Sequence, residues 1–279
     1  MRRFALIIAM LAAILSGCAG RVSFPNVTPG TPTEVTAKLI KPEGPGPFPA
    51  VVQLHGCGGL EPQSYRWAHW LADRGYVVLV VDSFGPREVK GDCRSGPGEP
   101  PITARFDDAF GALRYLQAQP FVIAGRVAAV GWSQGGVYAM AVINGPSLER
   151  ARLRGVKLPP VGFAASIGIS PGGCFSLVKE QVIRPLLVLI GGADDWTPAA
   201  KCKEMVDAMR GRGANASIVI YPGAYHYFDV EGQRLEVLPH VENESKPGGR
   251  GATVSYQAAA AADAHHQVEA FLARHLKAR

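Results

Sequence analysis

The apolar positions divide most of the chain into short runs that alternate with longer helix-like stretches. Residues 77–81 and 186–190 are apolar without interruption, which is what a parallel strand covered on both faces requires. Glycine and proline separate the runs. We predict strands at residues 35–40, 50–54, 76–81, 126–131, 163–169, 185–190 and 217–221. We predict helices at residues 64–74, 103–119, 134–143, 199–212 and 258–277.

The order of these elements predicts the fold class α/β. Strands that alternate with helices favour a doubly wound, mostly parallel sheet of about seven to eight strands, with helices on both faces. In such a sheet the functional groups lie at the carboxyl ends of the strands. Residues that directly follow a predicted strand are therefore the first candidates for chemistry.

The first seventeen residues have the pattern of a secretory signal. Two arginines precede a run of twelve apolar residues, 4–15, which is shorter than the roughly 20 residues needed to span a membrane as a helix. Leu15-Ser16-Gly17-Cys18 resembles the bacterial lipobox, in which the cysteine is lipidated. Ordinary secretion with cleavage near Ala19 is the alternative. We predict a lipoprotein signal peptide at 1–17, lipidated Cys18 and a tether at 18–34, and a catalytic domain at 35–279.

The predicted anchor also predicts a location. Cys18 would hold the protein on the periplasmic side of the bacterial cell envelope, through the membrane lipid. Ala19 is not the aspartate that often retains such proteins at the inner membrane. The outer membrane is therefore the favoured destination.

Composition and charge exclude several classes. The 279 residues are 47% hydrophobic and 19% charged, so the chain can bury enough surface to order itself. The net charge of +6 falls to +4 without residues 1–17. Arg150, Arg152, Arg154 and Lys157 lie close together, but Glu149, Gly155 and Pro159 interrupt them. We interpret this stretch as a solvated loop and expect no nucleic-acid partner.

A nucleophile is predicted after the strand at 126–131. The motif is Gly131-Trp132-Ser133-Gln134-Gly135-Gly136, and a helix follows it, which is the context of a G-x-S-x-G nucleophile elbow. The serine of an elbow sits in a strained turn, and the glycines remove the Cβ atoms that would collide there. We therefore predict Ser133 as the nucleophile.

A serine nucleophile needs a base and an acid that orients the base. Asp194 and Asp195 both follow the strand at 185–190, and we choose Asp194 as the acid. His226 follows the next strand, at 217–221, and lies downstream of the acid. None of the other six histidines has this position, so we predict His226 as the base.

Acyl transfer also needs N–H donors for the developing oxyanion. One predicted donor is the backbone N–H of Gln134, at the start of a helix. The other is the backbone N–H of Cys57, within the glycine-rich loop His55-Gly56-Cys57-Gly58-Gly59 that follows the strand at 50–54. A reactive thiol at Cys57 is the competing interpretation, although no base adjoins it in the sequence.

These motifs resemble the dienelactone hydrolase family of α/β-hydrolases. The resemblance runs from about Val35 to the C-terminus and implies the α/β-hydrolase fold, with Ser133, Asp194 and His226 as the triad. Its motifs are His55-Gly56-Cys57-Gly58-Gly59, Asp82-Ser83-Phe84-Gly85-Pro86-Arg87, Gly131-Trp132-Ser133-Gln134-Gly135-Gly136, the Asp194 segment and Tyr221-Pro222-Gly223-Ala224-Tyr225-His226. Family members often place the acid four residues before a proline, as Asp194 stands to Pro198.

Two positions depart from the family. Its founding enzymes use a cysteine nucleophile and an acidic residue near the early glycine loop, whereas Ser133 and His55 stand at these places here. The departures agree with each other, because a serine needs no acid that controls a thiolate. We therefore expect a small-molecule carboxylic ester, rather than dienelactone itself, as the substrate.

Three residues are candidates for binding that substrate: His55, Arg87 and Trp196. An arginine near the place of Arg87 contacts a substrate carboxylate in the family. A loop salt bridge from Arg87 is an equal alternative, and its candidate partners are Glu88, Asp92 and Asp108. Residues 229–257 form a long polar segment that borders the pocket or is only a surface loop.

Four cysteines remain if Cys18 is lipidated, an even number in an oxidising compartment. Three pairings are open. We favour Cys57 with Cys93 and Cys174 with Cys202, because each pair would join loops at the carboxyl edge of the sheet; buried free thiols are the alternative. No two cysteines have metal-ligand spacing and no two histidines lie four apart on a helix, so we expect no metal and no cofactor.

The leading hypothesis is a monomeric serine hydrolase that cleaves carboxylic esters through an acyl-enzyme on Ser133. A peptidase of the oligopeptidase type ranks lower, because no large propeller or lid domain precedes the catalytic unit. A catalytically silent surface lipoprotein with a binding role is the alternative from another class. The complete set of catalytic residues counts against it.

Overall fold

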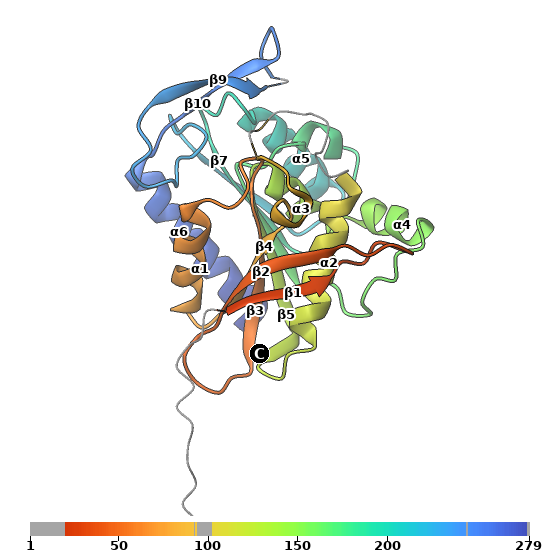
Figure 1. The fold of residues 1–279 in the computed structure, drawn as a ribbon. Helices are drawn as coiled ribbons and strands as arrows, with labels where there is room; N and C mark the ends of the chain where they lie inside the picture. Colours follow the sequence, from red (N-terminus) through yellow and green to blue (C-terminus); the bar gives the residue numbers. More distant parts are fainter. Residues whose placement is uncertain (1–19, 92, 94–101, 244, 278–279) are drawn as a thin grey trace, which may run out of the picture.

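The computed structural model describes residues 20–91, 93, 102–243 and 245–277, so the predicted signal peptide and Cys18 lie outside the described residues. Its centre is an eight-stranded sheet with the order β1-β2-β4-β3-β5-β6-β7-β8 (Figure 1). The strands are β1 Gly20–Pro25, β2 Glu34–Ile40, β3 Phe48–Leu54, β4 Val77–Asp82, β5 Val122–Trp132, β6 Ala165–Ile169, β7 Leu186–Gly191 and β8 Ala216–Tyr221.

The sheet is mostly parallel. Strand β2 pairs antiparallel with β1 and β4, and every other pair from β4 to β8 is parallel. The chain returns between parallel strands through helices, as a doubly wound sheet requires. The predicted α/β architecture is confirmed, and all seven predicted strands are present within a few residues of their expected ends.

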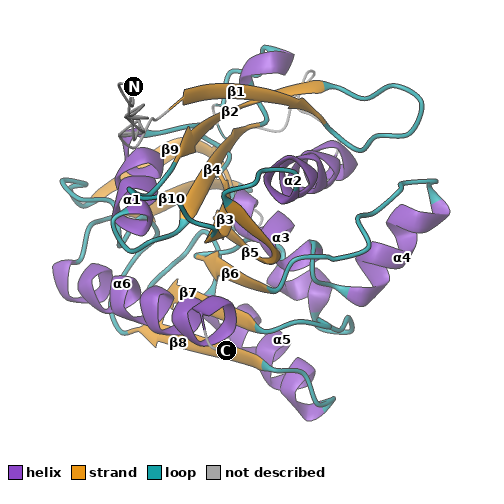
Figure 2. Ribbon diagram, turned by 90° about the horizontal axis from the view of Figure 1, so that it is seen from below, coloured by secondary structure: helices purple, strands orange, loops and turns teal. Residues whose placement is uncertain are grey.

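Helices cover both faces of the sheet. They are α1 Pro62–Ala72, α2 Ile102–Gln117, α3 Gln134–Ala141, α4 Gly145–Leu153, α5 Ala199–Gly211 and α6 Ala258–Leu272, with short helical turns η1 Gly85–Arg87, η2 Cys174–Leu177 and η3 Ala273–Lys277. Along β4, Val78 and Val80 pack with α1 and α6, whereas Val77 and Leu79 pack with the core under α2, α3 and α5. Figure 2 shows α1 and α6 on one side of the strands and α2, α3 and α5 on the other. Burial on both faces explains why the strand reads as a continuous apolar run.

The N-terminal segment corrects the predicted tether. Residues 20–25 form β1, which pairs with β2 through Phe24 opposite Val35. Phe24 is only 4% exposed, and Val27 is also buried in the core. Apolar Val22 and Phe24 alternate with polar Arg21 and Ser23, a period-two signal for a strand that is half buried. The folded domain therefore includes residues 20–34.

Two further segments differ from their expected form. The basic stretch at residues 149–159, expected as a solvated loop, begins in a helix: α4 covers residues 145–153, and its N-terminus is capped by the side chain of Asn144 on the N–H of Ser147, at 2.9 Å. The polar segment at 229–257 contains a separate two-stranded hairpin, β9 Glu236–Glu242 and β10 Arg250–Val254. The hairpin lies above the sheet in Figure 1, at the end where α3 begins.

Within the described part of the chain, no helix combines the length and the apolar character needed to cross a membrane.

The role of β1 in the core gives a stability prediction. Phe24→Ala should lower the free energy of unfolding by about 3–5 kcal/mol, because it removes a buried aromatic ring and leaves a cavity. Phe175→Ala is the matched control, since Phe175 is 59% exposed and its loss should cost within about 0.5 kcal/mol. Denaturant unfolding measures both. Equal, small losses of unfolding free energy in both variants would indicate that residues 20–25 are a tether and not part of the folded domain.

Candidate active site

Ser133 lies in a sharp turn between β5 and α3. Its backbone has φ 52° and ψ −117°, a left-handed conformation that costs about 1–3 kcal/mol for a residue other than glycine. The flanking glycines leave no room for a side chain: a Cβ on Gly131 would overlap the carbonyl of Gly135, and one on Gly135 would overlap the carbonyl of Leu54. The turn is therefore the nucleophile elbow that the motif predicts, with the serine projecting from the carboxyl end of the sheet.

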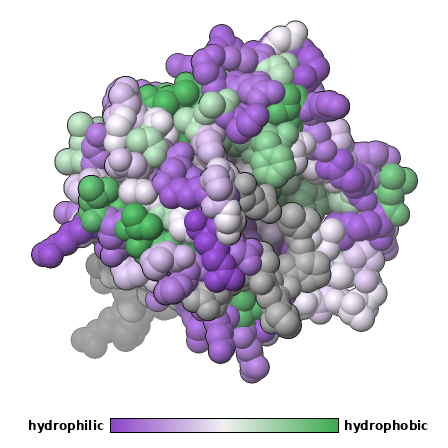
Figure 3. Space-filling model, turned by 90° about the horizontal axis from the view of Figure 1, so that it is seen from above, coloured by the Kyte–Doolittle hydropathy of each residue, from purple (hydrophilic) through white to green (hydrophobic). Residues whose placement is uncertain are grey.

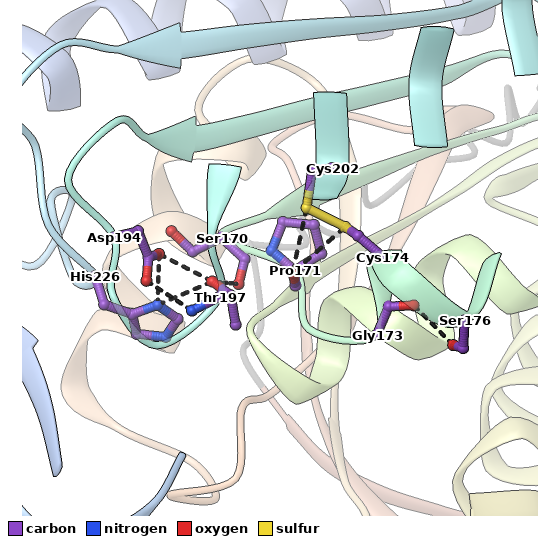
Figure 4. Close-up of a disulfide and its surroundings, with 9 residues drawn as sticks. All are labelled: Ser170, Pro171, Gly173, Cys174, Ser176, Asp194, Thr197, Cys202 and His226. Carbon is purple, nitrogen blue, oxygen red and sulfur yellow. Dashed lines mark hydrogen bonds and ion pairs between the residues drawn. A yellow bond between two sulfur atoms is a disulfide. The ribbon is translucent and has the colours of Figure 1, made fainter. Parts of the chain in front are cut away.

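His226 and Asp194 form a buried hydrogen-bonded pair. The ring Nδ1 of His226 lies 2.8 Å from Oδ2 of Asp194, and both side chains are at most 1% exposed (Figure 4). Backbone N–H groups of Trp196 and Thr197 bond Oδ1 of Asp194, and the Thr197 hydroxyl donates to Oδ2 at 2.9 Å. The carboxylate therefore accepts the Nδ1–H of His226, which leaves Nε2 with the lone pair that a general base needs.

The neighbouring Asp195 has a different partner. Its carboxylate accepts the backbone N–H and the hydroxyl of Thr253 at 2.8 and 2.7 Å, and pairs with Nζ of Lys246 at 2.6 Å. Burial alone would raise the pKa of Asp195, but the hydrogen bonds from Lys246 and Thr253 outweigh it and lower the pKa. Asp195 therefore fastens the β9–β10 hairpin to the acid loop, and Asp194 is the residue placed on the histidine.

Ser133 and His226 line the same small cavity, of about 40 Å³. Ser133 also lines an open cleft of about 250 Å³ on its other side, together with Trp196. Figure 3 views this end of the molecule, where hydrophilic residues cover most of the surface and apolar residues form small separate patches. Ser133 thus lines both a narrow cavity and a wider, open cleft.

The two predicted oxyanion donors lie beside the nucleophile. Gln134 is the first residue of α3, so its N–H has no partner within the helix. The loop that contains Cys57 packs on the elbow, because a Cβ on Gly56 would come within 3.6 Å of the Cβ of Ser133, and Cys57 lines both cavities. Cys57, Gln134 and Ser133 thus line the same open cleft, and the role of the two N–H groups as oxyanion donors stays a prediction.

Arg105 links the two parts of this region, and the sequence analysis missed it. Its guanidinium donates to the carbonyl of His55 at 2.5 Å and to the side-chain oxygen of Gln134. The rings of Phe84 and Tyr138 lie 5.0 and 4.6 Å from the same guanidinium. Nothing in the sequence distinguishes this arginine from the others in the chain, because its role depends on where α2 packs.

His55 supports the glycine-rich loop. Its Nε2 accepts the N–H of Ser83 at 3.3 Å, so Nδ1 carries the proton and donates to the carbonyl of Gly56 at 2.7 Å. Burial, with the nearby charge of Arg105, holds the pKa of His55 well below its usual value. Both ring nitrogens are engaged with the backbone, and His55 lines the small cavity at Ser133. Contact between His55 and a substrate stays a prediction.

Arg87 also has a structural partner. Its two terminal nitrogens each lie 2.8 Å from a carboxylate oxygen of Asp108, and one of them also donates to the carbonyl of Ser83. Arg87 lines neither cavity at Ser133. The salt bridge with Asp108 is therefore the correct alternative, and the expected contact with a substrate carboxylate is not formed by this arrangement.

Trp196 occupies the place expected of it. Its ring lies 4.8 Å from the ring of His226, and its indole N–H donates to the carbonyl of Glu242 in the hairpin at 2.7 Å. The ring lines the open cleft. Contact between Trp196 and a substrate stays a prediction.

Both expected disulfides are present. Cys57 is bonded to Cys93, and Cys174 to Cys202, so the pairing is confirmed and Cys57 is not a free thiol. All four cysteines line the open cleft. Figure 4 shows the bond between Cys174 and Cys202 beside Pro171, close to the acid loop. The two bridges therefore fasten loops on the walls of the cleft.

Among the residues that the structure describes, no group of three or more His, Cys, Asp or Glu side chains could hold a metal ion.

Comparisons with known proteins agree with this geometry. The sequence model of the dienelactone hydrolase family matches residues 35–276. A Bradyrhizobium protein named "Probable 2-oxo-3-(5-oxofuran-2-ylidene)propanoate lactonase" is 24% identical over 202 residues, which are 69% of this chain and 78% of that protein. Human acyl-coenzyme A thioesterase 1 is 26% identical over 70% of this chain, and the chain spans only 52% of its length.

A solved structure shows the same fold. The dienelactone hydrolase from Anabaena variabilis has a TM-score of 0.62 and 17% sequence identity, with 92% of this chain and 99% of that chain covered. The α/β-hydrolase fold implied by the motifs is thus confirmed.

The different partners of the two aspartates give a prediction. Asp194→Asn should slow hydrolysis of p-nitrophenyl acetate by about 10³–10⁴-fold, because an amide favours the wrong tautomer of His226. Steady-state kinetics measures the loss. If Asp194→Asn kept an activity within about tenfold of wild type, Asp194 would not be the acid that orients His226.

Asp195→Asn is the matched control. It should keep turnover within about threefold and lower the melting temperature near pH 7, because it weakens the attachment of the hairpin. The pKa of Asp195 is lowered in the folded state, so its stabilisation is present above the unfolded-state pKa and is lost as the pH falls through the folded-state pKa. The difference in melting temperature from wild type should therefore shrink as the pH falls below the unfolded-state pKa of about 3.9.

Proposed function

The chain belongs to the dienelactone hydrolase family, and on this premise we propose that it is a serine hydrolase that cleaves carboxylic esters through an acyl-enzyme on Ser133. The observation that carries the proposal is the buried hydrogen bond that Nδ1–H of His226 donates to Asp194, together with the small cavity that His226 and Ser133 both line. Nucleophile, base and orienting acid are the three groups that acyl transfer to a serine requires.

Each group has a role in the proposed reaction. Oγ of Ser133 attacks the ester carbonyl carbon while Nε2 of His226 takes the hydroxyl proton. The N–H groups of Cys57 and Gln134 stabilise the oxyanion that forms. His226 returns the proton to the departing alcohol, then activates a water that releases the acid from Ser133. Asp194 holds the imidazole in position throughout.

Relatives and cavity size support an ester substrate of modest size. The Bradyrhizobium relative is named as a lactonase and the human relative as a thioesterase, and both names describe hydrolysis of an activated acyl bond. An open cleft of about 250 Å³ at Ser133 lies just below the usual range for small-molecule sites. Serine in place of the family's founding cysteine favours ordinary carboxylic esters.

A fluorophosphonate probe tests the proposal. The probe should label the wild-type protein and leave Ser133→Ala unlabelled, because the variant lacks the attacking oxygen. Labelling measured by intact mass gives the result, and circular dichroism checks that the variant folds. Equal labelling of both proteins would refute Ser133 as the nucleophile.

Substrate assays separate the remaining functions. p-Nitrophenyl esters should be hydrolysed faster than peptide amides of matched acyl group. Preference for amides would favour the peptidase alternative. No turnover and no labelling by the probe would favour a silent lipoprotein with a binding role.

We also propose that Cys18 carries a lipid that anchors the protein to the periplasmic side of the bacterial envelope. The lipobox-like segment at 15–18 supports this, and the two disulfides agree with an oxidising compartment. In a bacterial host fed an alkyne fatty acid, the wild type should become labelled and Cys18→Ser should not. Labelling of both would refute the anchor.

A further inference from the structure

A second buried carboxylate lies near the proposed triad and has no part in the mechanism above. Asp229 follows His226 by three residues and is buried. One of its oxygens, Oδ2, accepts three side-chain N–H bonds: from Gln63 at 2.6 Å, Trp67 at 2.9 Å and Trp132 at 2.8 Å. Three donors on one carboxylate oxygen make a connection between three separate segments of the chain.

The segments joined by Asp229 include both halves of the catalytic machinery. Asp229 belongs to the loop of the base, where the carbonyl of His226 also accepts the N–H of Ser255 at 3.1 Å. Trp132 is the last residue of β5 and directly precedes Ser133. Gln63 and Trp67 come from α1, on the face of the sheet that α1 shares with α6.

The hydrogen bond from Trp132 to Asp229 lies next to a strained residue, because Trp132 directly precedes Ser133. The φ of Ser133, 52°, persists only where the surroundings hold the backbone in place. On one side the elbow is held by backbone bonds from Ser133 N–H to the carbonyl of Ile169 and from the N–H of Gly172 to the carbonyl of Ser133. On the other side the indole of Trp132 is fixed to the loop of His226 through Asp229.

We propose that Asp229 is a positioning residue, which sets the distance and angle between Ser133 and His226 by holding Trp132 to the loop of the base. The proposal rests on the proposed serine hydrolase function. Small displacements of reacting groups cost large factors in rate, so the bond to Trp132 should matter for turnover as well as for folding.

A purely structural role makes a different prediction. Asp229 also bonds Trp67, whose ring lies 5.4 Å from that of Trp132 but which precedes no catalytic residue and lines neither cavity at Ser133. If Asp229 only stabilised the fold, losing either indole bond would have the same effect on turnover. The two tryptophans therefore probe the same oxygen from two places: Trp132 precedes Ser133 and lines the small cavity, and Trp67 does neither.

The test compares Trp132→Phe with Trp67→Phe. Each variant keeps an aromatic ring and loses one N–H bond to Asp229. Trp67→Phe should lower the melting temperature more than Trp132→Phe, because Trp67 is fully buried and its loss also leaves a cavity in the core. Trp132→Phe should lower kcat for p-nitrophenyl acetate by about tenfold, with KM within about twofold, and slow fluorophosphonate labelling by the same factor. Trp67→Phe should keep kcat within about twofold of wild type. An unchanged kcat in Trp132→Phe, or equal losses in both variants, would overturn the proposal.

A third variant asks whether an acceptor at this place is enough. Asp229→Asn keeps an oxygen that can accept the indole N–H bonds, so kcat should stay within about threefold of wild type. A loss as large as that of Trp132→Phe would overturn the positioning role of the acceptor. Labelling of the wild type at Ser133 is measured first: its absence refutes the proposed function, whereas normal labelling with no effect of Trp132→Phe refutes only the role of Asp229.

Discussion

The close approach of backbone segments at the nucleophile elbow is the constraint on which the site depends. Gly131 and Gly135 allow the end of β5, the start of α3 and the end of β3 to lie nearer to one another than any side chain would permit. Ser133 then takes a left-handed conformation in the turn between β5 and α3. Parallel pairing of β5 with β3 and β6 supplies the rigid frame that holds this local strain.

Loops from the carboxyl ends of other strands complete the site, and each is fixed by its own bonds. Asp194 orients His226, Asp195 holds the hairpin, and Arg105 joins the loop of His55 to Gln134. Disulfides fasten the loops of Cys57 and Cys174 on the walls of the cleft. A scaffold of buried strands thus presents irregular segments whose shape depends on polar and covalent links as well as on buried apolar residues such as Ala224 and Phe228 in the loop of His226.

The sequence predicts the elements of this architecture well where one physical signal is strong. Uninterrupted apolar runs locate strands such as β4 and β7, and the glycines around Ser133 identify the elbow. The alternation of apolar Val22 and Phe24 with polar residues is a weaker signal, because it covers only a few positions. The sequence therefore predicts a tether where the structure has strand β1. Arg87, His55 and Asp229 show a different limit. Their partners Asp108, Ser83 and Trp132 lie far away in the chain or on other elements, so tertiary packing alone decides which polar groups these side chains contact.

The central claim is that Ser133 carries the acyl group during turnover. Mixing the protein with excess p-nitrophenyl acetate, quenching with acid and mapping the peptides by mass tests it directly. We expect a burst of nitrophenol close to one equivalent of protein and an acetyl group on the peptide that contains Ser133. An acetyl group on another residue, or turnover without any acylated peptide, would contradict it.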